Sequence, residues 1–250
     1  MSFRFINPPE QPPQGVQHRT FFSPLAGHEV GCNIYLPRDY HESDRRYPLV
    51  LHLHGWMCHE SSDIHAMEKV YAARDAITVF PNYCLPVDDL EHFPLEERLL
   101  EEFLPCIERE YRTIASREGR HISGFSMGGG LAFYYAVKHP ELFSSVTAYA
   151  GTYHHYFDQE FATVGAPIEQ AAAFRETILG MNNPSEKNIL HWLNRQADAI
   201  RGKLKIEMRV GTEDILHCDN EITHLHLDSL HIPHTYVKIP GAGHHLEAIV

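Results

Sequence analysis

The sequence predicts an α/β fold, in which a mostly parallel, twisted sheet carries helices on both faces. Short apolar runs alternate along the chain with stretches of helical period, an order typical of parallel strands joined by right-handed crossovers. The motif Gly124-x-Ser126-x-Gly128 follows one such run and precedes good helix-forming residues. This pattern is typical of a nucleophile elbow, a sharp strand-to-helix turn that exposes a serine at the carboxyl edge of a sheet.

Composition limits the domain organisation and the partners. With 250 residues, of which 43% are hydrophobic, the chain can bury a sizeable core. We expect a single α/β domain over residues 1–250, with an extended proline-rich arm over 1–17 and a cap-like insertion over 152–203. The formal charge of −12 disfavours nucleic acid and anionic membranes as partners. No apolar run is long enough to span a bilayer.

Cysteine usage and the first residues predict a cytoplasmic protein. The segment 1–17 has no apolar core of the kind that signal peptides carry. The cysteines are scattered, odd in number and without a C-x-x-C pair, so we expect reduced thiols. They are Cys32, Cys58, Cys84, Cys106 and Cys218. Nothing beside Cys58 or Cys84 marks either as a nucleophile, and we expect both to be inert.

The elements before the elbow begin with a hairpin. Two strand-like runs, at 20–22 and 29–36, flank the turn sequence Pro24-Leu25-Ala26-Gly27, which predicts an antiparallel pair. Apolar runs then predict buried strands, and apolar residues at helical spacing predict helices. The predicted strands cover 48–54 and 77–81, and the predicted helices cover 64–74 and 95–111.

The elements after the elbow alternate in the same way. A helix through 131–137 should end before Pro140, since the residue before a proline avoids the helical region. Strands are predicted at 120–123, 145–150, 205–210 and 235–239, and helices at 189–200 and 217–231.

Two stretches carry a family resemblance. The run Leu104–Arg112, followed by Gly124–Gly129, resembles the putative-esterase family of α/β-hydrolases. This family includes esterase-D-like, tributyrin-type, feruloyl and acetyl esterases and the mycolyltransferases. The resemblance extends from about Phe21 to His244, and it implies an α/β-hydrolase fold and a serine hydrolase.

A serine nucleophile needs a histidine base, and the base needs an orienting carboxylate. In this fold the carboxylate follows the serine along the chain and the histidine comes last. We predict that Ser126 is the nucleophile and Asp214 the orienter. Asp214 lies just after the strand 205–210, and the resemblance to a family G-x-x-D pattern, with Asn220 as the following asparagine, supports it. Glu213 and Asp219 stay as alternatives, and a solvated turn or a helix N-cap is the non-catalytic explanation.

The base is predicted at His244. The family shows a glycine-rich turn and then the catalytic histidine, often followed by tryptophan one residue later. Here Leu246 takes the tryptophan position and Ala242 replaces a common glycine, so His245 stays as the alternative base. The chain has 20 histidines, and a surface histidine is the non-catalytic explanation.

Tetrahedral intermediates of acyl transfer need an oxyanion hole, usually two backbone N–H groups. One should be the amide of Met127, the residue after the nucleophile. The resemblance places the other on the residue after His54-Gly55, which is Trp56. His54 should brace this loop without transferring a proton.

Other motifs predict no cofactor. Five histidines lack the spacing of known metal motifs, and we expect them on the polar face of one helix. They are His217, His224, His226, His231 and His234. The run Gly128–Gly130 lacks the lysine of a phosphate-binding loop, and no G-x-G-x-x-G is present, so we expect neither a metal nor a cofactor.

We therefore expect a serine carboxylesterase that hydrolyses small, short-chain acyl esters through an acyl-enzyme intermediate. The alternatives are a thioester hydrolase like the S-formylglutathione hydrolases, a feruloyl or acetyl carbohydrate esterase, or an acyltransferase. A further alternative is a catalytically idle hydrolase scaffold that acts as a binding module. The oligomeric state is open, with a homo-oligomer as one option.

Overall fold

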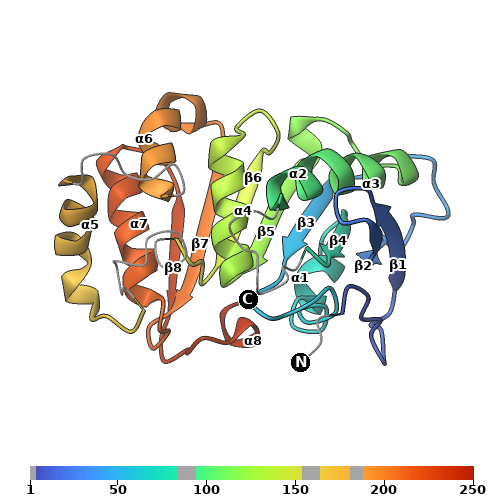
Figure 1. Ribbon diagram of the computed structural model, residues 1–250, viewed down its shortest axis with the longest axis horizontal. Coiled ribbons are helices and arrows are strands. Elements are labelled where there is room, and N and C mark those ends of the chain that lie inside the picture. Colours follow the sequence, from blue (N-terminus) through green and yellow to red (C-terminus); the bar gives the residue numbers. More distant parts are fainter. Residues whose placement is uncertain (1–3, 84–93, 154–163, 181–187) are drawn as a thin grey trace. The chain divides into compact units, whose positions relative to one another are not determined.

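The computed structural model describes residues 4–83, 94–153, 164–180 and 188–250. These residues form two compact units, Met1–His121 and Ile122–Val250. Both consist of strands covered by helices (Figure 1), which confirms the predicted α/β class. The expectation that residues 1–250 form a single domain with a cap-like insertion stays a prediction.

The strands of the first unit are ordered β1-β2-β4-β3. Strands β1 (Val16–Ser23) and β2 (His28–Tyr35) form the predicted antiparallel hairpin. Strand β2 also pairs antiparallel with β4 (Ile77–Pro81), which runs parallel to β3 (Leu49–Leu53). Every residue of β3 and β4 is buried, as the continuous apolar runs predict.

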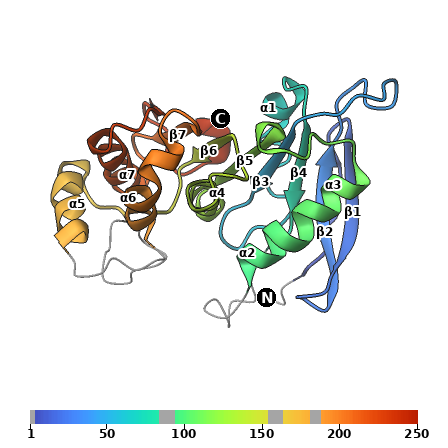
Figure 2. The ribbon, with the colours of Figure 1, turned by 90° about the horizontal axis from the view of Figure 1, so that it is seen from above.

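The helices of the first unit lie on opposite faces of these strands, α1 on one and α2 with α3 on the other (Figure 2). Helix α1 covers only Glu68–Ala72, so the prediction of a helix over 64–74 is wrong at both ends. The carboxylate of Asp63 lies within hydrogen-bond distance of the His52 ring, 3.2 Å from its Nε2. It is therefore engaged elsewhere and does not cap a helix that would begin at Ile64.

The predicted helix over 95–111 is helical but not uniform. It consists of α2 (Leu95–Glu97), the π-helical segment η1 (Arg98–Phe103) and α3 (Leu104–Glu110). Pro105 has no N–H to donate four residues back, and its ring crowds the preceding turn. A wider π-helical turn before Pro105 accommodates this defect.

The residues before β1 are attached to the first unit through a buried carboxylate. Glu60 is 1% exposed and accepts hydrogen bonds from the backbone N–H and the side-chain amide of Asn7. Its Oε1 also lies 3.2 Å from His18 Nε2. These partners satisfy a buried carboxylate that would otherwise be costly.

The strands of the second unit are ordered β5-β6-β7-β8. They are β5 (Arg120–Phe125), β6 (Ser145–Tyr149), β7 (Lys205–Gly211) and β8 (Thr235–Ile239). The last three are parallel, in a register that pairs Tyr149 with Arg209 and Gly211 with Ile239. Their carboxyl ends therefore share one edge of the sheet, as the predicted topology requires.

The helices of the second unit include α4 (Met127–Lys138), α6 (Ile189–Ile200) and α7 (His217–Ser229). Helix α4 packs on β6 and contacts α6, and α8 (Leu246–Ile249) lies on the opposite face (Figure 2). The segment η3 (Ile168–Gln170) leads into α5 (Ala171–Gly180), which packs on α7.

Helix α7 corrects one prediction about the histidines. It ends at Ser229, so His231 and His234 lie beyond it. His226 is 2% exposed and its Nε2 lies 3.1 Å from Asn194 Oδ1, so it does not belong to a polar surface. The expectation of five histidines on the polar face of one helix is wrong.

No disulfide joins the described cysteines to one another, and Cys84 lies outside the described residues. Burial raises the pKa of the Cys58 thiol, which keeps it protonated and supports an inert role. Within the described ranges, no helix has the length and apolar character that crossing a bilayer requires.

Candidate active site

The chain turns from strand to helix within one residue at Ser126. Strand β5 ends at Phe125, α4 begins at Met127, and Ser126 between them has φ 55° and ψ −118°. A non-glycine residue in this region costs on the order of 1–3 kcal/mol and needs surrounding structure to hold it. The Ser126 N–H donates to the Tyr149 carbonyl at 2.9 Å, and the Ser126 carbonyl accepts from Thr152 N–H at 3.1 Å. Both backbone groups of the serine are thus fixed to the end of β6.

Glycines after the serine allow α4 to approach this strand end. A Cβ on Gly129 would lie 2.9 Å from the Gly124 carbonyl oxygen, and a Cβ on Gly130 only 2.0 Å from the Thr152 carbonyl oxygen. Side chains cannot fit at such distances. Close approach thus depends on Gly129 and Gly130, which the motif-based argument did not single out.

Three polar side chains meet beside the elbow. His244 Nε2 lies 3.0 Å from Ser126 Oγ, and His244 Nδ1 lies 3.0 Å from both carboxylate oxygens of Asp214. The Asp214 side chain is fully buried, whereas the His244 ring is 25% exposed. All three residues belong to the second unit.

The hydrogen-bond partners determine the histidine tautomer. An ionised carboxylate only accepts, so Nδ1 of His244 carries the proton and donates it toward Asp214. The Nε2 lone pair is then directed at the Ser126 hydroxyl. Asp214 Oδ1 also accepts the Leu216 N–H at 2.8 Å, which fixes the carboxylate at the start of its loop.

The loops after β7 and β8 are joined by their backbones. Thr212 N–H donates to the Ile239 carbonyl and Glu213 N–H to the Ala242 carbonyl, both at 3.0 Å. Gly211 lies so close that a Cβ there would be 2.0 Å from the Ala242 carbonyl oxygen. This contact brings the segments that carry Asp214 and His244 together.

The alternative residues lie elsewhere. Glu213 is exposed, and Asp219 is buried and accepts the Tyr153 N–H at 2.6 Å. His245 is exposed at the N-terminus of α8. Asn220 donates to the carbonyls of Gly151 and Leu216, so it braces the loop after β6.

One neighbour of the histidine was not anticipated. The ring of Phe125 stacks on the His244 ring, with centroids 4.8 Å apart and an interplanar angle of 28°. This packing limits rotation of the imidazole. The sequence shows an aromatic residue directly before the elbow serine, but the direction of its side chain depends on the strained turn and could not be predicted.

The two predicted oxyanion donors lie in different units. Met127 is the first residue of α4, where backbone N–H groups have no partner within the helix. Trp56 follows β3 in the first unit and is 40% exposed. The role of the Trp56 amide stays a prediction.

The loop that carries Trp56 is braced by His54. This ring is buried, stacks on Tyr83 at 4.4 Å and has its Nδ1 2.8 Å from the Gly55 carbonyl. The Tyr83 hydroxyl donates to the His54 carbonyl. Burial lowers the pKa of His54 to about 4, so the ring is neutral at physiological pH.

A family model described as putative esterase matches residues 23–229. A curated esterase from Mycobacterium tuberculosis is 31% identical over 158 residues, which cover 59% of this chain and 34% of the relative. The chain thus spans about a third of the length of the curated relatives it matches.

Solved structures show the same fold. A ferulic acid esterase superposes with a TM-score of 0.72 at 21% identity and covers 93% of this chain and 92% of its own. An S-formylglutathione hydrolase from Staphylococcus aureus gives a TM-score of 0.73 at 16% identity, with 92% of each chain covered. At these identities the likeness concerns the fold, which confirms the α/β-hydrolase prediction.

Proposed function

This chain belongs to the putative esterase family, and we propose that it is a serine carboxylesterase that hydrolyses short-chain acyl esters through an acyl-enzyme intermediate. The observation that carries the proposal is the continuous hydrogen-bond chain from Asp214 through His244 to Ser126. It ends on a serine held in a strained turn at the start of a helix. These are the parts that nucleophilic acyl transfer requires.

The proposed reaction begins with attack of Ser126 Oγ on the ester carbonyl carbon. His244 Nε2 accepts the hydroxyl proton, and the buried Asp214 carboxylate stabilises the imidazolium that forms. The negative oxygen of the tetrahedral intermediate would accept hydrogen bonds from the amides of Met127 and Trp56. His244 then gives its proton to the departing alcohol, and water activated by the same ring hydrolyses the acyl-enzyme.

The described part of the insertion supports a small acyl group. Helix α6 has an apolar stripe, but that stripe is buried in the second unit: Ile189, Leu190, Leu193, Ala197 and Ile200. Among residues 152–153, 164–176 and 188–203, whose side chains the structure describes, no large hydrophobic side chain is exposed. A lipase acting at an oil–water interface needs a large exposed apolar surface, so a short acyl chain fits better.

Two other substrate classes share this chemistry. The superposed structures carry the names ferulic acid esterase and S-formylglutathione hydrolase. A serine nucleophile can cleave oxygen esters and thioesters by the same acyl transfer, so the substrate class depends on the groups that line the pocket. A binding module without activity is disfavoured, because the three side chains are already hydrogen-bonded to one another.

The test combines covalent labelling with a substrate series. Wild-type protein should react with a fluorophosphonate probe, and Ser126→Ala should not. Removing His244 should lower kcat about as much as removing Ser126, because the groups act as a unit. His245→Ala is the matched control and should keep its activity. Labelling of Ser126→Ala, or loss of activity only in His245→Ala, would refute the assignment.

Substrate class is tested with p-nitrophenyl esters of two to twelve carbons, below micelle-forming concentrations. Each buried methylene contributes up to about 0.8 kcal/mol until the pocket ends, so kcat/KM should peak at acetyl to butyryl. A maximum at eight carbons or more contradicts the short-chain proposal. A strong preference for feruloyl esters or S-formylglutathione would change the substrate class and leave the nucleophile unchanged.

A further inference from the structure

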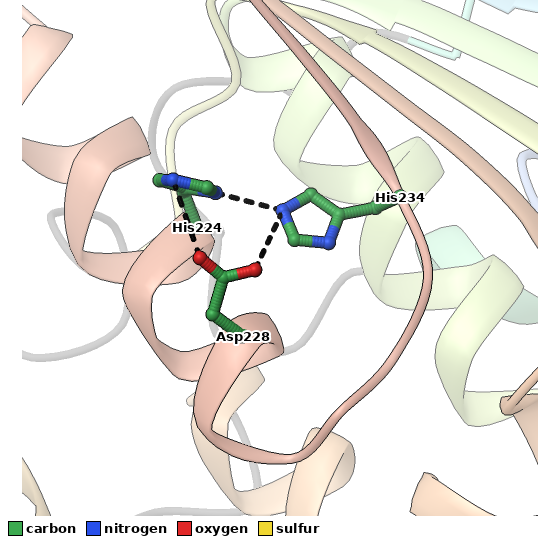
Figure 3. A group of neighbouring side chains, drawn as sticks. All are labelled: His224, Asp228 and His234. Carbon is green, nitrogen blue, oxygen red and sulfur yellow. Dashed lines mark hydrogen bonds and ion pairs between the residues drawn. The ribbon is translucent and has the colours of Figure 1, made fainter.

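A second polar cluster lies in the second unit, at the C-terminal end of α7. It consists of His224, Asp228 and His234, whose candidate ligand atoms all lie within 4.8 Å of one another. Figure 3 shows the three side chains next to one another, two from the helix and one from the segment that precedes β8, with one ring nitrogen of His224 facing His234 and the other facing Asp228. The spacing of these residues in the sequence matches no standard metal motif.

The turn after α7 builds this cluster. Ile232 N–H donates to the Leu227 carbonyl and His231 N–H to the Asp228 carbonyl, while His231 has φ 53°. This pattern is a Schellman motif, which closes a helix through a residue in the left-handed region. The motif reverses the direction of the chain, and the buried side chain of Ile232, 2% exposed, holds the turn in place. His234 is thereby brought over the last turns of the helix.

On the helix, His224 and Asp228 are four residues apart and share one face. The closest approaches are 2.8 Å between His224 Nδ1 and His234 Nε2, 3.5 Å between His224 Nε2 and Asp228 Oδ2, and 4.0 Å between His234 Nε2 and Asp228 Oδ1. Ligand bonds of about 2.0–2.2 Å in tetrahedral geometry need about 3.3 Å between ligand atoms. These approaches involve both nitrogens of His224, whereas one ring binds an ion through one nitrogen; with one ligand atom from each residue, the atoms lie within 4.8 Å of one another. The side chains of His224, 23% exposed, and Asp228, 60% exposed, can rotate to bring these atoms to the required spacing.

The hydrogen bonds orient His234 for ligation. Its Nδ1 lies 2.9 Å from the Ile232 carbonyl oxygen, which can only accept, so Nδ1 carries the proton. In the neutral ring, the Nε2 lone pair is then directed at the centre of the cluster. Ligating histidines commonly hold their second N–H in this way. The His234 side chain is 4% exposed, so this orientation is fixed by its surroundings.

We propose that His224, Asp228 and His234 bind a zinc-type divalent cation with a water molecule as fourth ligand. Two imidazoles and one carboxylate favour zinc or its first-row neighbours, because calcium and magnesium select oxygen ligands. Binding breaks the hydrogen bond between the two rings, so that each ring ligates the cation through one nitrogen, and the charge of the cation offsets that of the Asp228 carboxylate.

The site is structural and separate from the serine. Asp228 lies 11 residues along α7 from His217, about 16 Å of helix rise, and β8 separates His234 from the loop that carries His244. The cation would join the end of α7 to the entrance of β8. Since Asp214 precedes α7 and His244 follows β8, binding stabilises the elements that carry both.

Chelator-treated protein should be titrated with Zn²⁺ in a calorimeter and with Co²⁺ in a spectrophotometer. We expect one tight site per chain and the visible bands of tetrahedral cobalt. At a free zinc concentration ten times the dissociation constant, zinc should raise the Tm of the protein by roughly 3–6 °C. Asp228→Asn should abolish the cobalt bands and the Tm rise while the esterase activity of the metal-free protein stays unchanged.

Asp228→Asn is the primary variant, because Asp228 is exposed and its replacement should not disturb the fold. His234→Ala would remove a buried ring and could destabilise the protein. Asp198→Asn is the matched control, since Asp198 is 95% exposed on α6, and it should bind zinc normally. His244→Ala should also keep the site. Absence of a tight site, or a cobalt spectrum that survives Asp228→Asn and is lost in His244→Ala, overturns the proposal.

Discussion

Replacing Gly211 with alanine should separate the carboxylate and the base of the candidate site. Gly211 ends β7, and a Cβ there would lie 2.0 Å from the Ala242 carbonyl oxygen. An ordinary contact begins near 3.4 Å, so the two loops must move apart by about 1.4 Å. The Asp214–His244 hydrogen bonds are 3.0 Å long, and a displacement of this size exceeds what a hydrogen bond tolerates.

The expected loss follows from the two functions of this contact. Misplacing a catalytic group by about 1 Å costs on the order of 10²-fold in rate, and losing the carboxylate's control of the imidazole costs up to about 10⁴-fold. We therefore expect kcat/KM of Gly211→Ala to fall by between about 10² and 10⁴. Overpacking should also lower the free energy of unfolding by about 1–3 kcal/mol.

The assay is hydrolysis of p-nitrophenyl acetate, with thermal unfolding measured on the same samples. Gly243→Ala is the matched control, because a Cβ on Gly243 would meet only His245 Cδ2 at an ordinary 3.8 Å. This control is adjacent to the base, yet it should keep kcat/KM within a few-fold. A fully active Gly211→Ala, or equal losses in both variants, would refute the reasoning.

Three further predictions concern the carboxylate, the buried histidine and the oxyanion loop. Asp214→Asn should leave the fold intact and lower kcat by about 10⁴-fold, because an amide no longer fixes the His244 tautomer; steady-state kinetics tests this. Burial lowers the pKa of His54 to about 4. As pH falls below about 6.5, the imidazole is therefore protonated in the unfolded chain but stays neutral in the folded protein. The free energy of unfolding should therefore drop by about 3 kcal/mol between pH 6.5 and 4, and in urea titrations His54→Asn should lose this part of the pH dependence. Trp56→Pro, which removes the backbone N–H, should lower kcat by about 10²–10³-fold, whereas Trp56→Ala should not.

The positions of most strands could be predicted from the sequence, because most are apolar runs bounded by turn residues, whereas the order of the strands in the sheet was not predicted. The boundaries of α1 could not, since they depend on a carboxylate that a distant histidine engages. The π-helical segment before Pro105 likewise results from a conflict between a helical pattern and a residue that cannot continue the hydrogen-bond ladder.

The candidate triad shows the same limit. Chain order and strand ends selected Ser126, Asp214 and His244, and the structure brings these side chains within hydrogen-bond distance. His244 was preferred to His245 only through the family resemblance, because neighbouring residues in a loop point in directions that the backbone decides and that residue types alone do not reveal. The stacking of Phe125 on the imidazole depends on the strained turn in the same way.

The cluster of His224, Asp228 and His234 could not be predicted from the sequence for a different reason. Its third member, His234, joins two helix residues only because the chain reverses at His231, a non-glycine residue with positive φ. Sequence patterns predict glycine or asparagine at such a position, so a histidine there gave no signal of a tight reversal. From motif spacing alone we expected these histidines on the polar surface of a helix, whereas in the folded protein the chain reversal places His234 beside His224.

The arrangement of the second unit explains why its two polar clusters can be tested independently. Helix α7 begins three residues after Asp214 and carries His224 and Asp228 near its other end. A rigid helix of this length keeps the clusters apart, so a substitution at one leaves the hydrogen bonds of the other intact. A cation at the far end can still act on the serine site, but only by stabilising the helix that both share. Zinc should accordingly change the temperature at which activity is lost more than kcat/KM at 25 °C, which separates a structural cation from one that takes part in the reaction.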